Sequence, residues 1–181
     1  KEAEQRFLSE NVGKYCISQE DFDLALAISD AVKNTEKHNE ITSTGNAEVC
    51  VFSNELPYQD IFLKGKIDWI NWEKKVILDL KTTSKTLDNG YIVRSIIKEN
   101  MYNIQQAMYE MLLDHNGFSG FEFIFEFVET KPPHGVRFFK ISSESALKSK
   151  QELDLKIALL QQCMLHNAWT SYSEELNVID I

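Results

Sequence analysis

Two short segments of the chain combine charged and apolar residues in a way that strongly restricts the fold. The first, at residues 63–69, is a strand-like run that ends in Asp68 and a tryptophan, and the second, at 76–83, holds Asp79 and Lys81 within an apolar run. Because strand side chains alternate between two faces, Asp79 and Lys81 point to the same side of a strand. The sequence therefore predicts a carboxylate and an ammonium side by side on a strand that is otherwise apolar.

The spacer at residues 71–75 is polar and short, so we expect it to return the second strand beside the first as a hairpin. That hairpin would bring Asp68 towards Asp79. Two carboxylates and a lysine would then converge.

Such a group has a specific chemical use. Two carboxylates supply the hard oxygen ligands that Mg²⁺ prefers and leave positions for water and a phosphate oxygen. A lysine beside them can steer or help deprotonate the attacking water and stabilise charge in the transition state. The alternative is a solvent-facing salt bridge at a sheet edge. The apolar strand around Asp79 and Lys81, and the Gly-x-Ile-Asp segment at hairpin distance, favour a catalytic group.

Residues 65–68 and 79–83 resemble the core of the PD-(D/E)xK nuclease superfamily, in which a hairpin carries an Asp and then an acidic residue followed by x-Lys. Residues 102–109 look like the Gln-x-x-x-Tyr helix of the RecB-like branch. The order of the chain is similar to that of RecE-type exodeoxyribonuclease domains of phages and prophages. Flanking segments extend this resemblance over about residues 15–172, namely 17–22, 46–49, 131–136 and 169–172.

The resemblance implies an α/β fold with a central mixed sheet flanked by helices, formed as one domain over residues 1–181. It implies that Asp68 and Asp79 hold Mg²⁺, with Mn²⁺ as a substitute, and that Lys81 acts on the water and the transition state. Glu48 and the Leu80 backbone carbonyl would be additional ligands.

The resemblance also assigns Gln105 and Tyr109, which lie four apart on a helix, to orient the water or the scissile phosphate. It implies exonuclease action on double-stranded DNA ends in recombination, by a ring-shaped homo-oligomer. Two alternatives remain open. One is an endonuclease on the same core, and the other is a non-catalytic DNA-binding or scaffold module that pairs with a single-strand annealing protein.

Relatives usually carry a further upstream helix, often with a histidine that faces the metals, and the sequence shows no counterpart of it. We expect the four histidines to be surface or core residues instead: His38, His115, His134 and His166.

The cysteines and the hydropathy exclude several classes of protein. Three scattered cysteines fit neither a disulfide framework nor a four-cysteine iron–sulfur cluster. No apolar run approaches the ~20 residues that span a bilayer, and the first residues lack the apolar stretch of a signal peptide, so we expect a cytoplasmic protein.

The net charge of −9 argues against DNA binding by the whole surface. A local basic track remains compatible with it, and we expect Lys85, Arg94 and Lys98 to contact DNA, although a polar surface role explains these residues equally well.

Hydrophobic periodicity and turn residues predict strands at 48–53, 60–70, 75–83, 121–128 and 136–141. The same signals predict single helices at 20–37, 91–115 and 143–168.

Overall fold

The computed structural model describes residues 2–53 and 61–169 of the chain. Its centre is a sheet whose strands lie in chain order: β1 (Asn46–Phe52), β2 (Lys64–Asn71), β3 (Val76–Thr83), β4 (Glu122–Glu129) and β5 (Val136–Phe139). The pair β3–β4 is parallel and the other neighbours are antiparallel. The predicted α/β fold with a central mixed sheet is therefore confirmed.

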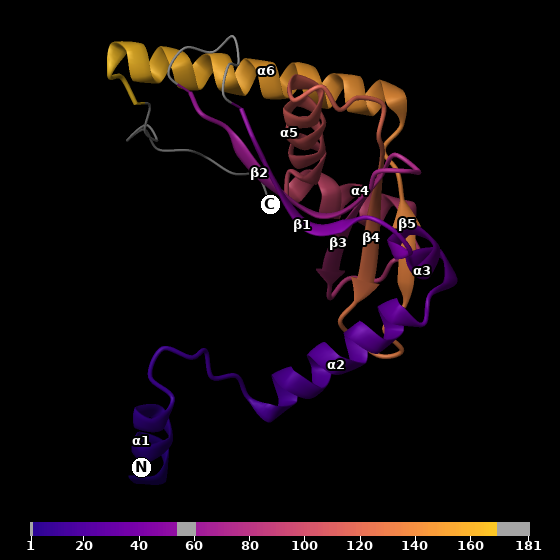
Figure 1. The fold of residues 1–181 in the computed structure, drawn as a ribbon. Coiled ribbons are helices and arrows are strands. Elements are labelled where there is room, and N and C mark those ends of the chain that lie inside the picture. The colour runs from indigo at the N-terminus through magenta and orange to yellow at the C-terminus, as the bar shows by residue number, and fades with distance from the viewer. Residues whose placement is uncertain (1, 54–60, 170–181) are drawn as a thin grey trace, which may run out of the picture.

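The parallel pair needs a crossover connection, since the chain must return to the starting end of β3 before β4 begins. Two helices supply it, α4 (Gly90–Glu99) and α5 (Tyr102–His115). The long helix α6 (Ser143–His166) lies across α5 at the outside of the molecule (Figure 1). Leu153 and Ile157 of α6 are buried in a small core that α5 shares.

The remaining helices precede the sheet in the chain: α1 (Glu2–Glu10), α2 (Gln19–Lys33) and α3 (Glu36–Thr42). The helix predicted over about residues 20–37 is present as α2 but ends at Lys33, and the last residues of that range belong to α3. Asn34 caps the end of α2, and Thr35 in extended geometry begins α3. In the described ranges, no helix has the combination of length and apolar character that crossing a bilayer requires.

The prediction of one helix over residues 91–115 is wrong. The amide of Asn100 closes α4 on the Ile96 carbonyl, and Met101 then takes a left-handed conformation with φ 54°. A left-handed residue costs roughly 1–2 kcal/mol. The bend lets both helices bury apolar side chains in the same core, for example Val93 of α4 and Leu112 of α5, and this burial offsets the cost.

That core covers one face of the sheet. Phe123, Phe125 and Phe127 alternate along β4 and all point into it, with exposed fractions of 4, 0 and 0 %. The aromatic face of this strand is thus packing. A smaller apolar cluster on the opposite face joins Ile41 of α3 to Leu78 of β3 and its neighbours.

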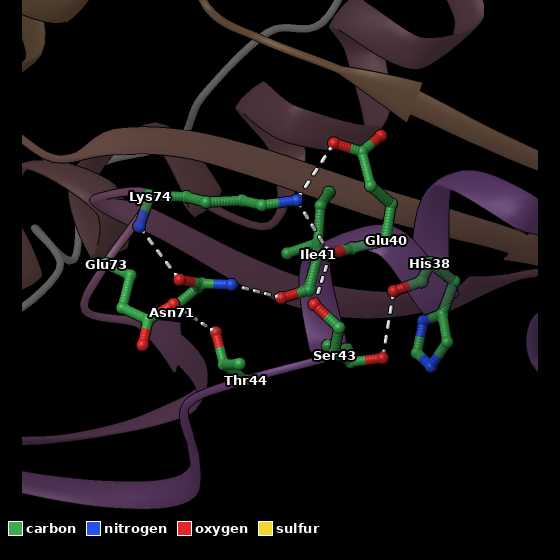
Figure 2. A network of polar contacts seen from close by, with 9 residues as sticks. His38, Glu40, Ile41, Ser43, Thr44, Asn71, Glu73 and Lys74 are labelled. Carbon is green, nitrogen blue, oxygen red and sulfur yellow. Dashed lines mark hydrogen bonds and ion pairs between the residues drawn. The ribbon is translucent and has the colours of Figure 1, made fainter.

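A polar network holds α3 against the turn between β2 and β3 (Figure 2). Asn71 is fully buried, donates from Nδ2 to the Ile41 carbonyl at 2.8 Å, and accepts from the Lys74 amide at 2.9 Å. The Lys74 ammonium reaches Glu40 of the same helix at 3.0 Å. The hairpin that carries the two aspartates is therefore fixed at its closed end.

Candidate active site

Asp68 lies where the ladder between β2 and β3 stops. The last paired residues are Trp69 and Leu78. One step further, Oδ2 of Asp68 accepts a hydrogen bond from the Leu80 amide at 2.9 Å. A side chain therefore takes the place of a backbone acceptor at the open end of the hairpin.

The alternation of side chains between the two faces of β2 is interrupted at the same point. Ile67 and Ile70 both lie in the main core with no exposed surface, although residues three apart on a regular strand point to opposite faces. The alternation is therefore interrupted between them, at Asp68 and Trp69. This interruption accompanies the turn of the Asp68 carboxylate towards β3.

Asp79 and Lys81 form a buried ion pair on β3. The Lys81 ammonium lies 2.7 Å from Oδ2 of Asp79, and their side chains are 13 and 0 % exposed. The ammonium also lies 4.7 Å from the centroid of the Tyr102 ring at the start of α5. A cation held between a carboxylate and an aromatic face has a well-defined position.

Burial raises the pKa of the Asp79 carboxyl to about 6. The Lys81 ammonium works in the opposite direction, and the negative charge of Asp68 adds to the rise. Asp68 is therefore near enough to interact with Asp79. The structure brings together the three residues that the hairpin pattern predicted.

Asp79 has a buried carboxylate oxygen that is free to accept from a ligand. Oδ1 of this buried carboxylate has no hydrogen-bond partner among the described residues. Leaving such an atom unpaired costs roughly 1–3 kcal/mol or more. Together with Asp68 it supplies the one or two carboxylates through which proteins usually hold Mg²⁺. The residues present therefore fit this ion.

Glu48 stands across from Asp68, between the pairs Ala47–Trp69 and Val49–Ile67 of β1 and β2. Its φ is 56°, and its exposed side chain pairs with the Lys66 ammonium on β2. Within residues 2–53 and 61–169, no three His, Cys, Asp or Glu side chains form a group that could hold a metal. Ligation by Glu48 stays a prediction, as does ligation by the Leu80 carbonyl.

Gln105 and Tyr109 bind each other and the hairpin. The Tyr109 hydroxyl donates to the Lys66 carbonyl at 2.8 Å and accepts from Nε2 of Gln105 at 2.9 Å. The tyrosine ring lies against Gly65, where an added Cβ would lie 2.7 Å from a ring carbon. The pair thus fixes the part of β2 that leads into Asp68. Direct contact with water or phosphate stays a prediction.

The family model for a PDDEXK-like domain of unknown function, DUF3799, matches residues 1–181. The chain belongs to this family. A comparison with curated proteins found no match.

This DUF3799 domain is similar to solved structures, and the first of them shares its fold. A candidate exonuclease from Eubacterium rectale is 16 % identical, with a TM-score of 0.66, and the match covers 94 % of this chain and 70 % of that one. A phage-related exonuclease from Haemophilus somnus 129PT is 14 % identical, with a TM-score of 0.47, and covers 89 % of this chain and 80 % of that one.

The three residues predicted to contact DNA lie in two different environments. Lys85 is paired with Glu99 at 2.8 Å. Arg94 and Lys98 instead line a cavity of about 450 Å³ beside α4. DNA contact by all three stays a prediction.

Two contacts near the candidate active site were not predicted from the sequence. Tyr102 contacts the Lys81 ammonium. Apart from its position at the start of a helix, nothing in the sequence indicated this contact. Glu126 is fully buried on β4, opposite Leu80 in register, and lies 2.8 Å from Nδ1 of His38. Burial raises the pKa of Glu126, and His38 opposes the rise. A glutamate within an aromatic strand was the available signal, and the His38 side chain is part-buried.

Proposed function

We propose that this PDDEXK-like domain is a Mg²⁺-dependent exonuclease that hydrolyses phosphodiester bonds of DNA from duplex ends. The observation that carries the proposal is the buried Asp79 carboxylate, with the Lys81 ammonium 2.7 Å away and Asp68 beside it. The similarity in fold to a candidate exonuclease supports the same reaction class.

Asp68 and Asp79 would hold the ion. When bound, Mg²⁺ supplies Lewis acidity that lowers the pKa of water and offsets charge on the leaving oxygen. The hydrogen bond from the Leu80 amide orients the Asp68 carboxylate before any ion binds. Such preorganisation lowers the cost of assembling the site.

Lys81 acts on the reacting phosphate and the attacking water. Its ammonium has three donors, of which one faces Asp79, so others remain for a non-bridging oxygen or the water. The Tyr102 ring restricts the ammonium through a cation–π contact. A fixed positive charge aimed at the phosphate stabilises the additional negative charge of the transition state.

Tyr109 positions β2, because its hydroxyl donates to the Lys66 carbonyl two residues before Asp68, and Gln105 holds that hydroxyl through a hydrogen bond from Nε2. Orientation of water or phosphate by Gln105 is part of the proposal. So are a ring-shaped homo-oligomer around the duplex and a single-strand annealing protein as its partner, both of which rest on the RecE-type resemblance.

The end requirement of an exonuclease tests the proposal. Linear plasmid should be degraded with Mg²⁺ or Mn²⁺, and the same plasmid in relaxed, covalently closed form should survive. A single restriction cut should restore degradation, which controls for sequence content. The Lys81→Met protein, purified in parallel, controls for contaminating nucleases. Cleavage of the closed circle at a rate similar to the linear form would reject the exonuclease and favour the endonuclease alternative.

A further inference from the structure

The cavity beside α4 is lined by residues of this helix, of the end of β5 and of the N-terminal part of α6. Its volume is about 450 Å³, within the range of small-molecule sites. Four of its lining residues are cationic and one is acidic: Arg94, Lys98, Lys140, Lys148 and Glu152. On a chain with a net charge of −9, this is a local concentration of positive charge.

The cations are only partly neutralised. Lys140 pairs with Glu122, and Lys148 pairs with Glu144 at 2.6 Å, but neither of these carboxylates lines the cavity. The Arg94 side chain makes no ion pair or hydrogen bond with any residue that the structure describes, and the same holds for Lys98. Since they lie four apart on α4, they project from the same side of that helix.

The wall also holds uncharged polar residues, beside apolar ones such as Val93 and Phe139. Asn103 and Ser149 are 5 and 4 % exposed, and Nδ2 of Asn103 donates to Oγ of Ser149 at 3.0 Å. Ser142 caps α6 through the Ser145 amide, and both serines line the cavity. The positive end of the α6 dipole therefore adds to the charge of the side chains.

We propose that this cavity binds a phosphate group, either from a nucleic-acid strand or from a free nucleotide. Phosphate suits the site because it carries more charge than a carboxylate and accepts hydrogen bonds from several sides, as a guanidinium, ammonium groups and hydroxyls provide here. The inference that the phosphate belongs to a nucleic-acid strand rests on the proposed nuclease function. The inference that the cavity binds phosphate does not.

The cavity and the candidate active site meet in the first turn of α5. Tyr102 contacts the Lys81 ammonium, and the next residue, Asn103, lines the cavity. A phosphate held beside Asn103 would belong to a part of the strand other than the one being cleaved. The cavity would thus hold the strand in register with the reacting bond.

Binding without divalent metal tests this proposal separately from cleavage. The probe is a labelled thymidine oligonucleotide of roughly ten nucleotides, within the usual length of single-strand sites, titrated in EDTA at several salt concentrations. Thymidine 5′-monophosphate and thymidine serve as competitors. The proteins are wild type, Arg94→Gln/Lys98→Gln, Lys140→Gln/Lys148→Gln, and Lys14→Gln/Lys33→Gln. The last variant loses the same charge from exposed lysines outside the cavity.

Each cavity variant should weaken oligonucleotide binding about tenfold or more and lower the slope of log affinity against log salt by about one unit. The control variant should change both much less. Competition by thymidine monophosphate but not thymidine indicates a site for free nucleotides, and no competition by either indicates strand phosphates.

Equal effects of cavity and control variants, or no effect of either cavity variant, would overturn the proposal. Lys140 and Lys148 are 59 and 70 % exposed, so their replacement should leave the melting temperature unchanged and keep the test interpretable. Unchanged binding by both cavity variants, with cleavage by the wild type, would contradict the cavity alone. Binding that the cavity variants lose, with no cleavage by the wild type in Mg²⁺, would contradict the proposed function alone.

Discussion

The Asp68 carboxylate accepts a hydrogen bond from the Leu80 amide at 2.9 Å, beyond the last paired residues of β2 and β3. The proposed function gives Asp68 a second role, as a metal ligand, and a substitution can separate the two. As a ligand it needs its negative charge, whereas as a partner of Leu80 it needs only an acceptor oxygen. This distinction leads to the first prediction.

Asp68→Asn should unfold in EDTA at nearly the wild-type urea concentration, because the amide oxygen still accepts from Leu80. Asp68→Ala should be less stable by about 1 kcal/mol, the usual contribution of one hydrogen bond. Both should lose cleavage and Mn²⁺ binding in calorimetry. Equal stability of the two variants would show that the Leu80 contact contributes little.

Lys81→Met should lower cleavage about 100-fold or more, as expected when one transition-state charge is removed. Methionine fills a similar volume at this 13 % exposed position. Mn²⁺ affinity should stay equal or increase, because the ammonium competes with a cation for Oδ2 of Asp79. Asp79→Asn should lose both cleavage and Mn²⁺ binding, and normal Mn²⁺ binding by it would refute the assignment of the ligand.

Gly65→Ala should destabilise the protein by about 1–3 kcal/mol, since its Cβ would lie 2.7 Å from the Tyr109 ring. Gly90→Ala is the matched control, because no heavy atom lies within 4 Å of its added Cβ and Gly90 begins a helix. Its stability should stay equal or rise. In a Tyr109→Leu background the cost of Gly65→Ala should shrink, and urea unfolding of the variants measures this coupling.

The reactive pair could be predicted from the sequence because strand alternation is a geometric rule. Asp79 and Lys81 had to share a face, and the short polar spacer had to bring Asp68 near them. The aromatic run on β4 followed the same rule. These features depend on residues close in the chain.

The features that could not be predicted depend on tertiary contacts. Met101 takes a left-handed conformation because two helices then reach one core, and an apolar periodicity that continues through it hides the break. Glu48 turns to Lys66 through a positive φ that its residue type does not demand. The His38–Glu126 contact joins residues 88 apart, for which no local pattern exists.

The last prediction concerns pH. Burial raises the pKa of Asp79 from 3.8 to about 6, so between these values the folded protein holds a proton that the unfolded chain has released. The contribution of Asp79 to stability is therefore greatest below pH 4 and declines as the pH rises to 6, by about 3 kcal/mol. Asparagine cannot titrate. Urea unfolding in EDTA measures the free energy of unfolding of wild type and of Asp79→Asn. Relative to the variant, the wild type should be more stable at low pH than at pH 6 by this amount.

Glu126→Gln is the control for that measurement, because the pKa of Glu126 is also raised by burial. Its difference from wild type should show the same direction of pH dependence. The effect of Mg²⁺ should distinguish the two residues, because only Asp79 is a proposed ligand. Above pH 6, where the Asp79 carboxylate is charged, added Mg²⁺ should raise the melting temperature of wild type and of Glu126→Gln. It should not raise the melting temperature of Asp79→Asn. A pH-independent difference for Asp79→Asn would mean that the carboxyl has the same pKa in the folded and the unfolded chain. Stabilisation of Asp79→Asn by Mg²⁺ would place the ion elsewhere.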